Sequence, residues 1–352
     1  MKVGSPSSAL LVLSLATLTI TLVTASQTSN WYVAISHSQV ELIVGPYNAS
    51  YITTLLSGAS KAVYIEVYEL TDKDVANTLS DLASRGVQVY VVLSGNVYGG
   101  IPSSEKKLVG QLNSSGVHVT FNKNFTYVHS KVFVIDNKTV ILGSINPTYY
   151  GLHKDYGVDL VIHNSTIARV YASIILSDFY RVPVKNVNYP GVVVSPLNSY
   201  RYLSTLLSQS GTVYLAFEEL YPSSGLFDEL ATHQVIGAVA PYSGNSEAVK
   251  QFGLKQVDHL TAKVIVVGDY VYVGSVNLSS NSIFHNRELG IIVKDPVLAS
   301  ELRGLIENWS GVTTTIATTT QMTQEVGYSK YGLIIALVLL AIIVILVLLS
   351  RR

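Results

Sequence analysis

The sequence predicts an α/β fold made of two related units, each a mixed β-sheet covered by helices, packed about a pseudo-twofold axis. Two observations favour this class. Between residues 40 and 310, short apolar runs alternate with amphipathic segments of helical length, as expected where helices cover a sheet. The segment VYIEVYEL at 63–70 also recurs about 150 residues later as VYLAFEEL at 213–220. A repeat of this kind indicates a duplicated domain.

A second pair of matching segments sets the limits of the two units. Lys131 followed by GSIN at 143–146 recurs as Lys263 followed by GSVN at 274–277, at an offset of 131 or 132 residues. The order of the matches is preserved, and the smaller offset means that the second copy has lost residues. We place the first repeat at 27–186 and the second at 187–311.

The expected elements of the first repeat follow in order. Residues 62–67 predict a strand, residues 72–84 a helix that Arg85-Gly86 ends, and residues 87–93 a second strand. A further strand is expected at 117–121. Residues 131–135 and 139–142 then predict two strands joined by a hairpin at 136–138.

Charge and cysteine content exclude several classes of protein. The chain has 23 basic and 23 acidic residues, which argues against a dedicated polyanion-binding protein with clustered Lys and Arg. It contains no cysteine, so disulfides, thiol catalysis and thiolate-bound metals are excluded.

Both ends of the sequence predict export and membrane attachment. Residues 1–25 have the pattern of a secretory signal, with an uncleaved N-terminal anchor as the alternative. Residues 331–349 carry no charge and predict a transmembrane helix, and Arg351-Arg352 place its end in the cytoplasm. The Thr-rich segment 312–330 predicts a stalk. We therefore expect a single-pass cell-membrane protein with its main domain outside, where its seven Asn-x-Ser/Thr sequons suit a glycoprotein.

One segment carries residues suited to phosphate chemistry. His129 and Lys131 are two apart on a strand, so both side chains leave the same face. A neutral imidazole can attack phosphorus or transfer a proton, and an ammonium beside it neutralises phosphate charge. Ser144 and Asn146 follow the next strand and offer a hydroxyl and an amide to phosphate oxygens.

The spacing His-x-Lys-x4-Asp-x6-Gly-Ser-x-Asn, from His129 to Asn146, resembles the motif of the phospholipase D superfamily, most closely its small secreted nuclease branch. The resemblance implies a two-step reaction through a covalent phosphohistidine, without a metal or another cofactor. Asp136 matches the motif aspartate, for which we expect a structural role at the hairpin. The residues implied for catalysis and phosphate binding are His129, Lys131, Lys263, Ser144, Asn146, Ser275 and Asn277.

The second copy departs from this motif at its histidine. Thr261 stands two residues before Lys263, where the family has His. His259 lies two residues further upstream, about 7 Å along a strand, and reaches the site if the strand starts late, if it bulges, or if the substrate is large. His259 is therefore either a replacement catalytic acid or a surface histidine beside Asp258.

A carboxylate shortly after the motif Asn commonly orients the histidine in this family. Glu288 fits that place in the second copy and Asp155 in the first, with Asp159 as a rival. Since the second copy has lost its histidine, we expect Glu288 to serve His259 or to have become a packing residue. Structural roles are expected for two carboxylates at the ends of equivalent strands, Glu69 and Glu219.

Two functions of different classes are consistent with these residues. The first is a membrane-anchored extracytoplasmic phosphodiesterase acting on phospholipid or nucleic acid. Lipid is slightly favoured, because few basic residues are available to neutralise a nucleic-acid backbone. The second is a non-catalytic phosphate- or glycan-binding surface protein, which Thr261 favours. We expect a monomer, since the second repeat already occupies the place that a partner subunit would take.

Overall fold

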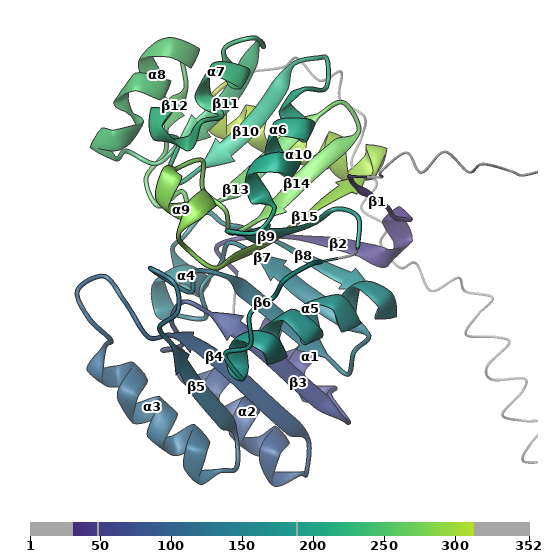
Figure 1. The fold of residues 1–352 in the computed structure, drawn as a ribbon, viewed down its shortest axis with the longest axis vertical. Coiled ribbons are helices and arrows are strands. Elements are labelled where there is room, and N and C mark those ends of the chain that lie inside the picture. Colours follow the sequence, from purple (N-terminus) through teal and green to yellow (C-terminus); the bar gives the residue numbers. More distant parts are fainter. Residues whose placement is uncertain (1–30, 48, 188, 313–352) are drawn as a thin grey trace, which may run out of the picture. The chain divides into compact units, whose positions relative to one another are not determined.

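The computed structural model describes residues 31–47, 49–187 and 189–312, which form two mixed β-sheets covered by helices (Figure 1). This confirms the predicted mixed α/β class. In spatial order, the first sheet contains β2 (Val40–Val44), β8 (Val158–His163), β7 (Thr139–Gly143), β6 (Lys131–Ile135), β3 (Ala62–Val67), β4 (Gln88–Ser94) and β5 (His118–Asn122). The second contains β1 (Val33–Ala34), β15 (Glu288–Lys294), β14 (Tyr270–Gly274), β13 (Lys263–Val267), β10 (Val213–Phe217), β11 (Val235–Val239) and β12 (Lys255–Gln256), with β9 (Val192–Ser195) also paired to β15.

Both sheets connect their strands in the same way. Strands β3, β4 and β5 run parallel to one another, as do β10, β11 and β12. Strands β6, β7 and β8 are antiparallel, as are β13, β14 and β15. The second sheet differs by β1, which comes from the start of the described chain and pairs with β15. The common order is what the repeated segments of the sequence predict.

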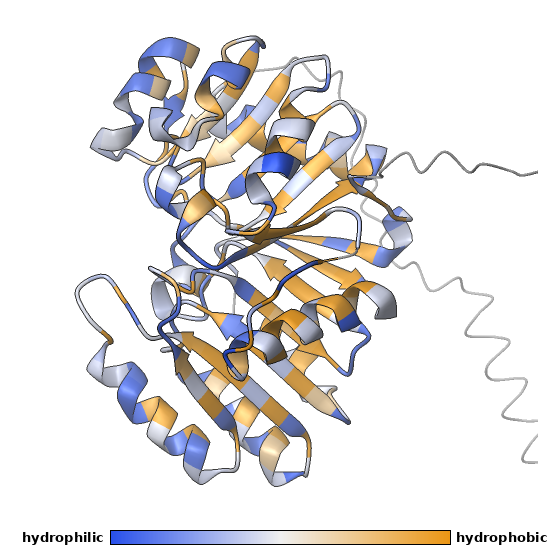
Figure 2. Ribbon diagram, viewed as in Figure 1, coloured by the Kyte–Doolittle hydropathy of each residue, from blue (hydrophilic) through white to orange (hydrophobic). Residues whose placement is uncertain are grey.

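The two sheets share one apolar core. In β6, Val132 and Val134 face this core, whereas Phe133 and Ile135 face helices on the outer side. Strand β13 repeats the alternation in the second sheet. Because both faces of such strands are buried, their sequences are unbroken apolar runs rather than alternating ones, and Figure 2 shows the strands as predominantly hydrophobic.

Helices fill the core between the sheets and cover their outer faces. The shared core contains α5 (Ser165–Phe179) and α10 (Pro296–Ser310). The outer face of the first sheet packs against α1 (Ser50–Ser57), α2 (Lys73–Ser84) and α3 (Ser103–Ser114). The outer face of the second packs against α6 (Ser199–Leu207), α7 (Phe227–Leu230) and α8 (Ser246–Phe252). The remaining short helices are α4 (Tyr149–His153), α9 (Ser280–Phe284), η1 (His37–Gln39), η2 (Pro222–Ser224) and η3 (Ser243–Asn245).

The predicted elements of the first repeat are found with small shifts at their ends. Strands 62–67 and 131–135 are observed as predicted. Helix α2 begins at Lys73 because the side chain of Asp72 caps it, accepting hydrogen bonds from the N–H groups of Asp74 and Val75. Helix α3 is missing from the sequence prediction, since its segment SSEKKLVGQLNS has a narrow apolar face with only Leu108 and Leu112 as buried leucines.

Asp136 has the structural role expected of it at the β6–β7 hairpin. Its carboxylate accepts hydrogen bonds from the N–H groups of Ser60, Lys61 and Ala62, and its backbone has a positive φ of 53°. Burial acts to raise its pKa, but the hydroxyl of Ser60 and these N–H donors lower the pKa below its ordinary value. Asp136 therefore joins the hairpin to the start of β3.

We expect Asp136→Ala to lower the free energy of unfolding by about 2–3 kcal/mol, because three donors lose a charged acceptor. Asp136→Asn tolerates the positive φ and should be destabilised less. A carboxylate with a lowered pKa stabilises the fold above its unfolded pKa, and this contribution is lost as the pH falls through the folded pKa. The gap between wild type and Asp136→Asn in urea unfolding should therefore close below about pH 4. A gap that is independent of pH would contradict the assignment.

Most of the predictions for the two termini concern residues that the structure does not describe. The signal segment at 1–25, the stalk at 312–330 beyond its first residue, and the transmembrane segment at 331–349 lie outside the described residues. Within the described ranges, no helix combines the length and apolar character needed to cross a bilayer. The repeat boundaries at 186 and 187 stay predictions.

Candidate active site

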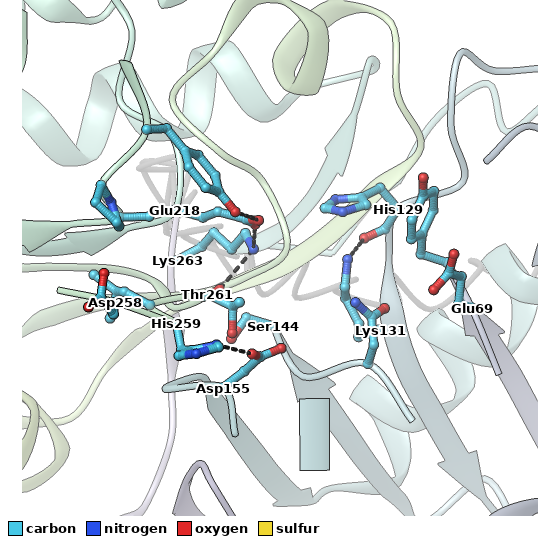
Figure 3. A pocket seen from close by; sticks show the side chains of 16 residues that line it. Glu69, His129, Lys131, Ser144, Asp155, Glu218, Asp258, His259, Thr261 and Lys263 are labelled. Carbon is cyan, nitrogen blue, oxygen red and sulfur yellow. Dashed lines mark hydrogen bonds and ion pairs between the residues drawn. The ribbon is translucent and has the colours of Figure 1, made fainter. Parts of the chain in front are cut away.

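A cavity of about 530 Å³ opens where the two repeats meet. Figure 3 shows His129 and Lys131 on one side of it, with Lys263 and His259 on the other. The predicted site residues that line the cavity are His129, Lys131, Ser144, Asn146, Asp155, His259 and Lys263. Each repeat therefore contributes its motif lysine to a single site.

The segment before β6 is held by the second repeat. The N–H of His129 donates to the carbonyl of Arg287 over 2.7 Å, and the N–H of Arg287 donates to the carbonyl of Tyr127 over 2.8 Å. The strand itself begins only at Lys131, so the prediction that His129 lies on a strand with Lys131 was wrong. These two backbone hydrogen bonds bring Glu288, the residue after Arg287, next to the imidazole of His129.

Glu288 is the partner of His129. Both carboxylate oxygens of Glu288 lie 3.2 Å from Nδ1 of His129, and the carboxylate is fully buried. Ser282 Oγ and Asn286 Nδ2 donate to it over 2.7 and 3.0 Å. Burial raises the pKa of Glu288, but His129 and the other donors lower it below its ordinary value. The carboxylate is therefore ionised, Nδ1 carries the proton, and Nε2 keeps its lone pair. The expectation that Glu288 serves His259 or only packing was wrong.

The charges around His129 favour its neutral form. Burial and the ammonium group of Lys131 lower the pKa of His129, against the opposing effect of Glu288. A neutral imidazole is the form in which histidine acts as a nucleophile. Burial and repulsion from Lys263 lower the pKa of Lys131 to about 7. Because a bound anion favours the charged lysine, anion binding and proton uptake at Lys131 are coupled.

Lys263 is paired with a carboxylate that the motif does not contain. Oε2 of Glu218 lies 2.6 Å from Nζ of Lys263. Burial opposes ionisation, but Lys263 and the nearby His129 lower the pKa of Glu218 to about 2. In the first repeat Tyr68 holds the equivalent place, and its ring packs edge-on against His129 at 4.9 Å. The repeated segments at 63–70 and 213–220 align Glu218 with Tyr68, so the repeat marks this position but does not indicate a carboxylate that pairs with Lys263.

The two Ser-x-Asn segments differ in their access to the cavity. Ser144 and Asn146 line it. Ser275 and Asn277 are buried outside the cavity lining, so the geometry does not support the prediction that they bind phosphate. The hydroxyl of Ser275 exchanges hydrogen bonds with the backbone of β15, and Oδ1 of Asn277 accepts from the N–H of Glu219. Their polar atoms are used to hold the second sheet together.

The carboxylates of the first repeat have separate partners. Asp159 Oδ1 accepts from the N–H groups of Ser144 and Ile145, so it fixes the backbone of the motif loop. Asp155 lies 3.6 Å from Nδ1 of His259. Structural roles were expected for both carboxylates at the strand ends. The side chain of Glu219 is hydrogen-bonded to Ser279, in accord with such a role, whereas Glu69 lines the cavity.

His259 reaches the cavity because its strand starts late. Strand β13 begins at Lys263, and the backbone of His259 is left-handed, with a φ of 60°. Its side chain is 53% exposed and stands at the wall of the cavity, facing Asp155 (Figure 3). The condition that the sequence set for its reaching the site is therefore met.

The Glu288 charge can be tested without an activity assay. Glu288→Gln keeps an acceptor for the Nδ1–H of His129 but removes the charge that raises its pKa. In an NMR titration, we expect the His129 ring protons to titrate at lower pH in this variant than in the wild type. Glu247→Gln, which changes an exposed carboxylate on α8, should leave that titration unchanged. An unchanged His129 titration in Glu288→Gln would show that the carboxylate does not act on the imidazole.

Comparison with known proteins places this geometry in a family. The family described as "Cardiolipin synthase, PLD-like domain" matches residues 52–179. The chain is 29% identical over 116 residues to mitochondrial cardiolipin hydrolase of Xenopus laevis, covering 33% of this chain and 53% of that protein. It is 28% identical over 139 residues to phospholipase D of Rickettsia bellii, covering 39% of this chain and 67% of that protein. The chain thus spans about half the length of the first relative.

A solved structure extends the likeness of fold. Phosphatidylserine synthase of Haemophilus influenzae is similar with a TM-score of 0.60 and 14% identity, over 78% of this chain and 87% of that one. At that identity the likeness shows the fold alone, but it covers more than either repeat. The family match includes the whole segment from His129 to Asn146 that carries the motif. The chain belongs to the phospholipase D superfamily.

Proposed function

We propose that this protein is a phosphodiesterase in which Nε2 of His129 attacks phosphorus. One observation carries the proposal: the buried carboxylate of Glu288 holds Nδ1 of His129 at the wall of a cavity that two motif lysines also line. A neutral imidazole fixed through its Nδ1–H by a carboxylate is the arrangement of an activated nucleophile or base. The names of the relatives, cardiolipin hydrolase and phospholipase D, support the same reaction class.

The residues of the cavity have separate roles in the proposed reaction. Attack forms a bond from phosphorus to Nε2 of His129, while the bond from phosphorus to the departing alcohol breaks. Lys131 and Lys263 stand on opposite sides of the cavity (Figure 3), where they neutralise the charge on the phosphate oxygens in the transition state. Glu288 stabilises the imidazolium form of the phosphohistidine. Water then attacks phosphorus, and His129 is released neutral.

The substrate that we propose is a phospholipid rather than a nucleic acid. A nucleic-acid strand is bound by neutralising successive phosphates, which an acidic lining does not favour, whereas a lipid headgroup presents one diester. We further propose an extracytoplasmic site on a membrane-anchored glycoprotein, from the sequence of residues 1–25 and 331–349. The carboxylates that line the cavity beside the two lysines are Glu69, Asp155, Glu218 and Asp258.

Trapping the covalent intermediate tests this function. The protein is mixed with a phospholipid that carries radioactive phosphorus and is quenched in alkali, which preserves phosphohistidine. We expect label on the peptide that contains His129, and none in His129→Ala. His285→Ala, which removes an exposed histidine outside the cavity, should keep the label. Hydrolysis without any label on His129 would contradict the proposed nucleophile.

A non-catalytic phosphate-binding protein is the second candidate. It is favoured by Thr261 at the place of the second motif histidine and by the ion pair that occupies Lys263. Inorganic phosphate should raise the unfolding temperature under either function. Protection by phosphate with neither hydrolysis nor label would support this second candidate over the enzyme.

A further inference from the structure

The second half of the site has lost both members of the pair that orients the nucleophile in the first. Thr261 stands where the first repeat has His129, two residues before the motif lysine in each case. Gly157 stands where the second repeat has Glu288, since each lies two residues before the strand partner of the motif glycine. The loss is therefore of a histidine together with its carboxylate.

Packing around Gly157 leaves no room for a carboxylate that would orient a histidine at position 261. A Cβ atom at Gly157 would lie 2.3 Å from Cγ1 of Ile145 and 2.9 Å from Oγ of Ser144. No carboxylate side chain fits there while those residues stay in place. Across the interface, the hydroxyl of Thr261 is buried without a hydrogen-bond partner among the described residues. A histidine restored at that position would find no carboxylate at Gly157 to orient it.

Two residues upstream on both segments, a histidine and a carboxylate face each other again. Nδ1 of His259 lies 3.6 Å from Oδ1 of Asp155 (Figure 3). The N–H of Tyr156 donates to the carbonyl of His259 over 2.8 Å, and the N–H of Thr261 donates to the carbonyl of Tyr156 over 3.0 Å. This is the same backbone exchange that aligns His129 with the second repeat. Because both segments shift by two residues, the side-chain partners stay opposite each other.

We propose that His259 and Asp155 form a rebuilt second half-site, in which His259 is the general acid for the leaving alcohol and Asp155 positions its ring. The assignment rests on the phosphodiesterase function proposed above and adds the residue that completes its reaction. His259 and His129 stand on opposite walls of the cavity (Figure 3). In-line displacement at phosphorus places the departing oxygen on the side away from the nucleophile, which is the His259 side.

Glu69 is the rival acid on the cavity wall, since burial raises its pKa. It lies beside Lys131, on the same side of the cavity as His129 (Figure 3). An acid there would face the attacking nitrogen rather than the departing oxygen. The geometry therefore favours His259.

Over the two steps of the proposed reaction, every proton that is donated is also taken up again. As the phosphorus–oxygen bond breaks, Nε2 of protonated His259 gives its proton to the departing oxygen, and the alcohol leaves neutral. Neutral His259 then takes a proton from the attacking water, whose oxygen bonds to phosphorus as the bond to His129 breaks. The products are an alcohol and a phosphate monoester, and both histidines return to their starting states.

Leaving-group dependence separates a general acid from a structural histidine. Two short-chain phosphatidic acid esters are compared, one with ethanol and one with 4-nitrophenol, which departs without protonation. For His259→Ala we expect the first-turnover rate of ethanol release from the ethyl ester to fall by about 10²–10⁴-fold. The first-turnover burst of 4-nitrophenol should keep its rate within about threefold, because His259 acts on that ester only in the later water step. Asp155→Asn should show the same pattern with a smaller loss. His285→Ala should change neither rate.

Each result decides the assignment. Equal losses of the first-turnover rate in His259→Ala on both esters, or no loss on either, would overturn His259 as the acid while leaving the phosphodiesterase function standing. Hydrolysis of the nitrophenyl ester alone by the wild-type protein would also overturn it, because a working acid must release ethanol. Failure of the wild type on both esters would overturn the proposed function, and this assignment with it. Thermal unfolding of each variant identifies losses caused by misfolding.

Discussion

A His129→Ala variant should lose at least about 10⁴-fold of kcat on a phospholipid substrate, because water must then attack phosphorus without a covalent intermediate. The loss should fall on kcat more than on KM, since Lys131 and Lys263 still line the cavity and bind the phosphate group. Steady-state kinetics on lipid dispersed in detergent measure both constants. Only 18% of the His129 side chain is exposed. The fold should nevertheless survive its removal, because the carboxylate of Glu288 retains two other donors.

Two further measurements distinguish loss of the nucleophile from a general effect of removing a histidine. His285→Ala removes a histidine of the segment that precedes Glu288, without touching the cavity lining, and should keep the wild-type kcat. Added imidazole should restore part of the rate of His129→Ala, since it can occupy the space left by the ring and act as the nucleophile. Retention of more than about a tenth of kcat in His129→Ala would exclude this residue as the nucleophile.

The second large effect is expected on stability, for Arg287→Met. The guanidinium of Arg287 lies 2.7 Å and 3.0 Å from the carboxylate of Asp178 and donates to the carbonyl of Ser195 over 2.8 Å, and both charged groups are buried. Removing the cation leaves Asp178 charged without its partner. We expect the free energy of unfolding to fall by about 3–5 kcal/mol, measured by urea denaturation.

A double variant tests that reason. Arg287→Met/Asp178→Asn removes both charges, so it should be more stable than Arg287→Met alone. Glu66 lies beside the pair, and burial together with the charge of Asp178 raises its pKa well above the ordinary value. This raised pKa favours the protonated form of Glu66, which adds no second unpaired charge when Arg287 is removed. A double variant no more stable than the single one would show that Arg287 acts through packing against Phe125 instead.

Much of the fold was predictable from local patterns. Strands 62–67 and 131–135 are apolar on both faces, so their sequences are marked by unbroken apolar runs. The end of helix α2 is marked by Gly86, whose φ of 85° suits glycine. Helix α3 has no such pattern, because it covers the sheet with one narrow stripe. Each of these outcomes depends on residues close together in the sequence.

By itself, the sequence determined the family and the intact half-site, because the motif from His129 to Asn146 lies in one hairpin whose spacing is local. Only the tertiary structure decided which carboxylate serves which histidine. Glu288 reaches His129, and Asp155 reaches His259, through backbone exchanges between segments more than 100 residues apart. The packing of the two sheets sets that register, and no local pattern encodes it. For the same reason the pairing of Glu218 with Lys263 depends on which strands lie side by side.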